Sequence, residues 1–147
     1  MGLKTVLAVG MMTLIVAPGI AVAQQGRISI WDGVYTDAQA ERGRVLYMQS
    51  CSSCHGADLS GSFETPPLVG RFMPYWSGST LDALFDYVST AMPMHNPGAL
   101  SAGANTDIVA FILKSNDIPS GSKDLGTGNL KAINFDPAKP VSRRARK

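Results

Sequence analysis

The sequence predicts a small all-α domain built from three main helices. Three segments, approximately residues 36–49, 79–90 and 101–116, repeat apolar residues at helical spacing. Each segment begins with a serine or threonine that can cap a helix. Loops rich in glycine and proline separate the segments. Together these observations favour helices throughout the central part of the chain.

The first predicted helix begins after Thr36, which forms a capping box with Gln39. Gly43 lies in the middle of this helix, where it costs roughly 1 kcal/mol relative to alanine. A glycine at that cost suggests that another helix approaches closely at this point. The helix is expected to run to about Gln49.

The second and third predicted helices each follow a loop. An aromatic loop over residues 72–78 leads to the second helix, which starts at Ser79 or Thr80 and ends before Ala91. Ser101 is the expected N-cap of the third helix, which stops near Asn116. The apolar stripe of the second helix consists of Leu81, Leu84, Phe85 and Val88.

The segments on either side of these helices are expected to have little regular structure. Residues 24–35 are interpreted as an extension over the surface of the domain, with Trp31 as a hydrophobic cover. Residues 36–119 then form the domain itself. Residues 120–147 are a C-terminal extension in which 130–135 is a short extended piece that packs back, followed by a basic tail.

The first 23 residues have the pattern of a secretory signal peptide. Met1 to Lys4 form a basic start, Thr5 to Ala17 form an apolar core, and the segment ends in Ala21-Val22-Ala23. The core is shorter than the roughly 20 residues that a membrane span needs. We therefore expect export and cleavage after Ala23, and the alternative is an uncleaved membrane anchor.

Charge is unevenly distributed along the chain. Residues 24–142 hold 8 basic against 11 acidic residues, a net charge of −3, whereas residues 143–147 hold four positive charges. This distribution does not indicate a basic face for nucleic acid. The terminal basic run is interpreted as a solvated tail, and docking of the tail on an acidic partner or a membrane surface is the alternative.

Both cysteines of the chain lie in the sequence Cys51-Ser52-Ser53-Cys54-His55. A CxxCH motif is the attachment signature of c-type haem. If the segment is helical, positions i, i+3 and i+4 share one face. Cys51 and Cys54 can then form thioethers with the two vinyl groups of one haem, while His55 holds the iron.

Three competing interpretations of the motif are weaker. A redox-active CxxC needs a thioredoxin-like strand and helix around it. A zinc site needs four ligands, and His95 would have to join the motif without the usual spacing. A disulfide between the two cysteines would close a loop too short to stabilise much.

The remaining candidate ligands follow the second helix. Met92, Met94 and His95 lie in a segment with two prolines and a glycine, which rule out regular structure. Pro93 restricts Met92 to an extended backbone, so Met92 is the expected sixth ligand of the iron. Met94 is its main rival, because residues i and i+2 of an extended segment face the same side. Met73 and His95 are weaker candidates.

A proline pair follows the motif at Pro66 and Pro67. Proline cannot donate a backbone hydrogen bond and holds an extended path, so this segment leaves free carbonyls. One of them could accept a hydrogen bond from Nδ1–H of His55 and so direct Nε2 to the iron.

In this order the parts resemble a class I c-type cytochrome over roughly residues 35–119. The resemblance implies a small cytochrome c fold, in which three main helices surround one covalently bound haem. It also implies that the first and last helices cross at Gly43, Tyr47 and Phe111.

The same resemblance implies roles for three residues of the loops. Pro66 would be the carbonyl partner of His55, and Leu68 a haem contact. Trp76 would donate its indole N–H to a haem propionate, since that group is a donor only.

A narrower resemblance, through residues 31–36 and 92–98, is to small exported cytochromes that accompany quinoprotein dehydrogenases. It implies a periplasmic monohaem carrier of single electrons, either a monomer or a dehydrogenase subunit. The expected partners are a dehydrogenase as donor and an oxidase or another cytochrome as acceptor. Two competing functions are a small peroxidase-like haem enzyme, which needs an open iron position, and a haem-based sensor.

Overall fold

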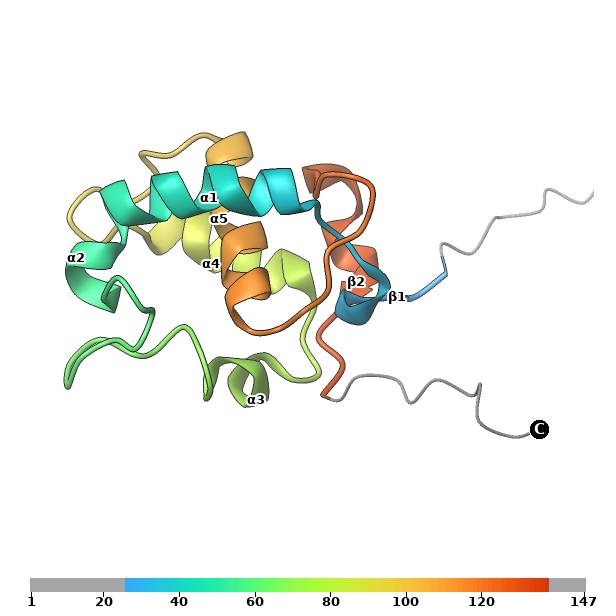
Figure 1. Ribbon diagram of the computed structural model, residues 1–147, viewed down its shortest axis with the longest axis horizontal. Coiled ribbons are helices and arrows are strands. Elements are labelled where there is room, and N and C mark those ends of the chain that lie inside the picture. The colour runs from blue at the N-terminus through green and yellow to red at the C-terminus, as the bar shows by residue number, and fades with distance from the viewer. Residues whose placement is uncertain (1–25, 138–147) are drawn as a thin grey trace, which may run out of the picture.

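The computed structural model describes residues 26–137. The predicted signal peptide and the basic run at residues 143–147 lie outside the described residues. The prediction of an all-α fold with three long helices, α1, α4 and α5, is confirmed (Figure 1). The elements in chain order are β1 (Ile28–Ser29), η1 (Ile30–Asp32), α1 (Asp37–Ser50), α2 (Ser52–His55), α3 (Phe72–Trp76), α4 (Leu81–Ala91), α5 (Ala102–Ser115), η2 (Thr127–Ala132) and β2 (Ile133–Asn134).

Helices α1 and α5 cross at Gly43, as predicted, and Figure 1 shows α1 running across α5. A Cβ atom at this position would lie 1.8 Å from the backbone oxygen of Asp107 in α5. One turn further along α1, the ring of Tyr47 packs against that of Phe111, with 5.2 Å between their centroids. The absence of a side chain at Gly43 therefore allows the two backbones to touch.

The capping box predicted at the start of α1 forms only in part. The Thr36 hydroxyl accepts a hydrogen bond from the backbone N–H of Gln39 at 3.1 Å. The Gln39 side chain does not return this contact, because it is buried and makes two hydrogen bonds to the backbone of Leu125, at 3.0 and 2.6 Å. Gln39 thus joins the C-terminal segment to α1.

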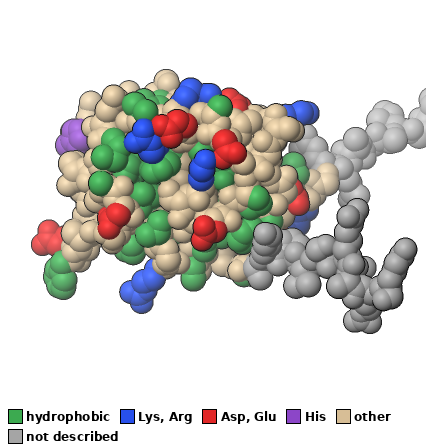
Figure 2. Space-filling view, viewed as in Figure 1, with side chains coloured by type: hydrophobic (Ala, Val, Ile, Leu, Met, Phe, Trp, Pro, Cys, Tyr) green, Lys and Arg blue, Asp and Glu red, His purple; other side chains and the backbone are tan. Residues whose placement is uncertain are grey.

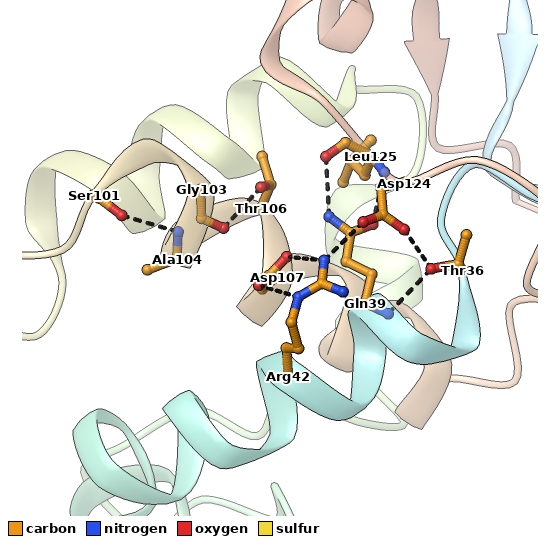
Figure 3. A network of polar contacts seen from close by, with 10 residues as sticks. All are labelled: Thr36, Gln39, Arg42, Ser101, Gly103, Ala104, Thr106, Asp107, Asp124 and Leu125. Atoms are coloured by element: carbon orange, nitrogen blue, oxygen red, sulfur yellow. Dashed lines mark hydrogen bonds and ion pairs between the residues drawn. The ribbon is translucent and has the colours of Figure 1, made fainter.

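A network of charged side chains links the same three parts of the chain (Figure 3). Arg42 of α1 pairs with Asp107 of α5 at 3.0 Å and with Asp124 of the C-terminal segment at 2.7 Å. Asp124 also accepts a hydrogen bond from Thr36. The hydrogen bond from Thr36 and the one from Arg42 hold the pKa of Asp124 below its usual value.

The flanking segments are more ordered than predicted, because they form a common part of the core. Strand β1 pairs in parallel with β2, with Ile28 opposite Ile133 and Ser29 opposite Asn134. For the C-terminal extension, the prediction of little regular structure is wrong at η2, whereas the prediction that residues 130–135 pack back as a short extended piece is confirmed at β2. The N-terminal extension forms β1 and η1, which the sequence did not predict. Five apolar residues of these segments are buried: Ile30, Leu125, Leu130, Ile133 and Phe135.

Trp31 is half-buried against the core, as expected of a hydrophobic cover. Its indole N–H also donates a hydrogen bond to the backbone oxygen of Asp136 at 3.1 Å. The predicted aromatic loop over residues 72–78 is wrong in part, because five of its residues form α3.

The remaining helix ends agree with the prediction. The Ser101 hydroxyl caps α5 by accepting from the N–H of Ala104 at 3.2 Å, and α4 follows Thr80 and ends at Ala91. Within residues 26–137 no helix is both long enough and apolar enough to cross a membrane. Acidic and basic side chains are mixed on the face shown in Figure 2, with hydrophobic side chains between them.

We predict that Gly43→Ala lowers the free energy of unfolding by about 3 kcal/mol, because the new Cβ would overlap backbone atoms of α5 that cannot move aside. Gly103→Ala is the matched control: nothing lies within 4 Å of a Cβ there, so its stability should be unchanged or slightly higher. Denaturant unfolding followed by circular dichroism measures both. Equal stability of the two variants would contradict the backbone contact at Gly43.

Candidate functional site

The domain encloses a cavity of about 840 Å³ between α2, α3, α4, α5 and the loops that follow α2 and α4. This volume is in the upper part of the range found for small-molecule sites. The structure brings together every residue that the sequence predicts for the site: Cys51, Cys54, His55, Pro66, Leu68, Trp76 and Met92 all line the cavity.

The cysteine motif is helical, as the haem interpretation requires. The N–H of Cys51 donates to the backbone carbonyl of Tyr47 at 2.8 Å and so caps the end of α1. The carbonyl of Cys51 accepts a hydrogen bond from the N–H of His55 at 3.0 Å. The Tyr47 hydroxyl donates to the carbonyl of Gly56 at 2.6 Å and so holds the far end of the turn. Burial above all raises the pKa of Tyr47 to about 12, so the hydroxyl keeps its proton.

The pKa of the Cys51 thiol shifts in the opposite direction to that found in redox-active pairs. Both cysteines are free, and Cys51 is half-buried while Cys54 is exposed. Burial, and then the neighbouring Cys54, raise the pKa of the Cys51 thiol to about 11. Redox-active CxxC motifs instead lower the pKa of their thiol. Within residues 26–137 no group of three His, Cys, Asp or Glu side chains could hold a metal ion, so the zinc interpretation finds no ligand set there.

His55 makes the hydrogen bond expected from the sequence. Its Nδ1 lies 3.0 Å from the backbone oxygen of Pro66. A carbonyl oxygen can only accept, so Nδ1 must carry the proton and Nε2 keeps its lone pair. This is the arrangement of a metal-bound histidine whose second nitrogen donates to a backbone carbonyl.

The loop that carries Pro66 is held by contacts on both sides of Leu68. The N–H of Leu68 donates to Leu59 at 2.8 Å, and its carbonyl accepts from the side chain of Asn116 at 2.8 Å. In the sequence pattern Asn116 marks only the end of the third helix, and nothing there indicates its contact with this loop.

The geometry separates the two methionines of the loop that follows α4. Met92 is half-buried, and its N–H bonds to the carbonyl of Val88 at 3.3 Å, so the last turn of α4 fixes its backbone. Met94 also lines the cavity, but 74% of its surface is exposed. His95 lines the cavity as well, whereas Met73 packs against the core and is not among the lining residues.

Trp76 presents an unpaired donor in this cavity. Among the contacts that the structure describes for residues 26–137, its indole N–H donates to no protein group, unlike that of Trp31. The indole packs instead among aromatic rings, 6.3 Å from Phe72, 6.2 Å from Phe135 and 6.4 Å from Tyr87.

Haem fits this set of residues. A large apolar cavity that offers two thiols, an imidazole with a free Nε2, a thioether sulfur and a donor for a carboxylate matches the groups by which haem c is held.

Sequence reasoning missed several residues of the cavity wall. Ile108 and Ile112 of α5 line it, and neither was assigned to the site from the sequence. Tyr75 and Tyr87 also line the cavity. Tyr75 directly precedes Trp76 in the sequence, which could have indicated its place at the site, whereas no such signal exists for Tyr87. The charged residues on the wall are Glu64 and Arg71.

Comparisons with known proteins agree with this geometry. The model of the family described as cytochrome C oxidase, cbb3-type, subunit III matches residues 38–112, just over half of the chain. This chain is similar in structure to a chain in the crystal structure of the sulfane dehydrogenase SoxCD from Paracoccus pantotrophus, with a TM-score of 0.52 and 22% sequence identity. The match covers 86% of this chain and 68% of the SoxCD chain. At that identity the likeness supports the fold. No curated protein matches the chain.

Proposed function

This chain belongs to the c-type cytochromes, through the family whose model matches residues 38–112, and we propose that it carries single electrons in the periplasm from a dehydrogenase to an oxidase or another cytochrome. Membership of the family makes the chain a haem-based electron carrier. The residues of the cavity support the more specific role.

The bound haem supplies the Fe(III)/Fe(II) couple. Cys51 and Cys54 would attach it covalently: addition of each S–H across one vinyl double bond gives a thioether with no oxidant or reductant required.

The observation that carries the proposal is that the two expected iron ligands, His55 and Met92, line the same cavity. His55 would hold the iron through Nε2, because the Pro66 carbonyl accepts a hydrogen bond from Nδ1–H. Met92 would supply a neutral thioether as the second protein ligand, and such a ligand together with histidine raises the reduction potential. A peroxidase-like enzyme or a gas sensor needs one of these positions open, so two protein ligands favour a carrier.

The remaining wall keeps water from the iron and orients the cofactor. Leu68, Leu84 and Ile112 line the cavity with apolar surface. Trp76 donates its free indole N–H to a carboxylate of the haem, which satisfies a donor that has no described protein partner. The protein's part is thus ligation, burial and electrostatics.

Electrons enter at the edge of the haem beside Cys51 and Cys54. Two large exposed hydrophobic side chains, Tyr75 and Met94, line the cavity and would offer apolar surface to a partner. Small, weakly charged contact areas of this kind are typical of transient redox complexes. The signal peptide expected at residues 1–23 supports a periplasmic location, where the partners would also lie.

Covalent attachment is tested by replacing the cysteines. Acidified organic solvent should extract no haem from the wild type, which holds it through two thioethers. The Cys51→Ala and Cys54→Ala variants should each retain one thioether, visible as a shift of the reduced pyridine haemochrome band, and the double variant should release its haem. Release of haem from the wild type would contradict attachment.

The sixth ligand is tested by comparing Met92→Ala with Met94→Ala. We expect the first variant alone to lose the long-wavelength sulfur-to-iron(III) absorption band and to show a lower reduction potential, since α4 fixes the backbone of Met92. Met94→Ala is the matched control, two residues away on the same cavity. Loss of the band in the Met94 variant alone would assign the ligand to Met94.

Electron carriage is tested by mixing the oxidised holoprotein with purified periplasmic dehydrogenases and following haem reduction by stopped flow. Reduction by one of them should be fast and stoichiometric, one electron per haem. In parallel, the reduced protein should bind carbon monoxide slowly and show no peroxidase turnover. Rapid carbon monoxide binding or substantial turnover would favour the sensor or the enzyme instead.

A further inference from the structure

Residues 133–135 lie outside the region that the family model matches, 38–112, and they pack against helix α3, which lines the cavity. Phe135 is joined on both sides to the connection between α3 and α4. Its carbonyl accepts from the N–H of Gly78 at 2.9 Å, and its own N–H donates to the carbonyl of Ser79 at 2.9 Å. The backbone of Phe135 is therefore held directly behind α3.

The side chain of Phe135 is fully buried and packs on two rings of α3. Its centroid lies 6.2 Å from that of Phe72 and 6.2 Å from that of Trp76, and Phe72 and Trp76 are 6.3 Å apart. Phe72 and Trp76 line the cavity, whereas Phe135 does not. The three rings form a triangle in which Phe135 supports the two that face the cofactor.

Little else in the structure can hold the indole of Trp76. Helix α3 has only five residues, and no side chain caps its start. The indole N–H makes no described hydrogen bond within residues 26–137, so packing rather than hydrogen bonding positions the ring. The rings of Tyr75 and Tyr87 also lie near it, with centroids at 5.5 and 6.4 Å, but both side chains are exposed. Phe135 is the buried and backbone-anchored member of the group.

We propose that Phe135 is a positioning residue for Trp76, so that the C-terminal segment sets the electrostatic environment of the cofactor. This inference rests on the proposed function of Trp76 as donor to a haem carboxylate. Hydrogen bonding to an ionised carboxylate disperses its negative charge. Without that contact the negative charge favours Fe(III), and the reduction potential falls. Phe135 thus raises the potential without touching the cofactor.

The test is a double-mutant cycle on the holoprotein, with the reduction potential and the free energy of unfolding measured for each variant. Trp76→Phe should lower the potential. Phe135→Ala should lower it in the same direction, Phe135→Leu should do so by less, and the double variant should match Trp76→Phe alone, because Phe135 acts through Trp76. Phe135→Leu keeps the test open if the alanine variant does not fold.

Leu125→Ala is the matched control, because Leu125 is equally buried in the same segment but contacts Gln39 on α1. It should lose stability and keep the wild-type potential. If Trp76→Phe lowers the potential while both Phe135 variants lose only stability, Phe135 has no positioning role. If Trp76→Phe leaves the potential unchanged, Trp76 is not a donor to the haem carboxylate, and the positioning role of Phe135 is wrong as well. The proposed electron carriage is tested separately, by reduction of the holoprotein with the dehydrogenases.

Discussion

The contact between the backbones of α1 and α5 at Gly43 is the constraint on which the rest of the domain depends. Helix α1 ends at the CxxCH turn, and α5 supplies Ile108 and Ile112 to the cavity wall. The distance between the two helices therefore sets how far the cysteines lie from the opposite wall. A side chain at Gly43 would push α5 away and widen the cavity, since the nearest atom is backbone. Close packing at this point is thus a condition for binding a flat cofactor tightly.

Sequence patterns predicted the parts of the fold that depend on local signals. The caps at Thr36 and Ser101 and the break after Ala91 define helix ends within a residue or two, because each is set by hydrogen bonds between near neighbours. The CxxCH motif behaves in the same way. Its spacing determines which side chains share a face once the turn is helical, and the structure places all three on the cavity.

Contacts between distant segments could not be predicted in this way. Gln39 has the sequence position of a capping-box residue, yet its side chain bonds to Leu125, 86 residues away. The strands β1 and β2 have two residues each, too few to show a period. Asn116 at the end of a helix gives no sign that it will hold the carbonyl of Leu68. Each of these contacts depends on where the rest of the chain lies, which local spacing does not encode.

The parallel pairing of residues 28–29 with 133–134 has a consequence for the folded state as a whole. Asn134 and Phe135 are consecutive, so opening of this small sheet withdraws a strand from one end of the domain and a ring from behind the cavity wall in one step. A cofactor that binds only the closed form therefore also stabilises the ends of the domain by mass action. Closing of the β1–β2 sheet and binding of the cofactor are then linked equilibria.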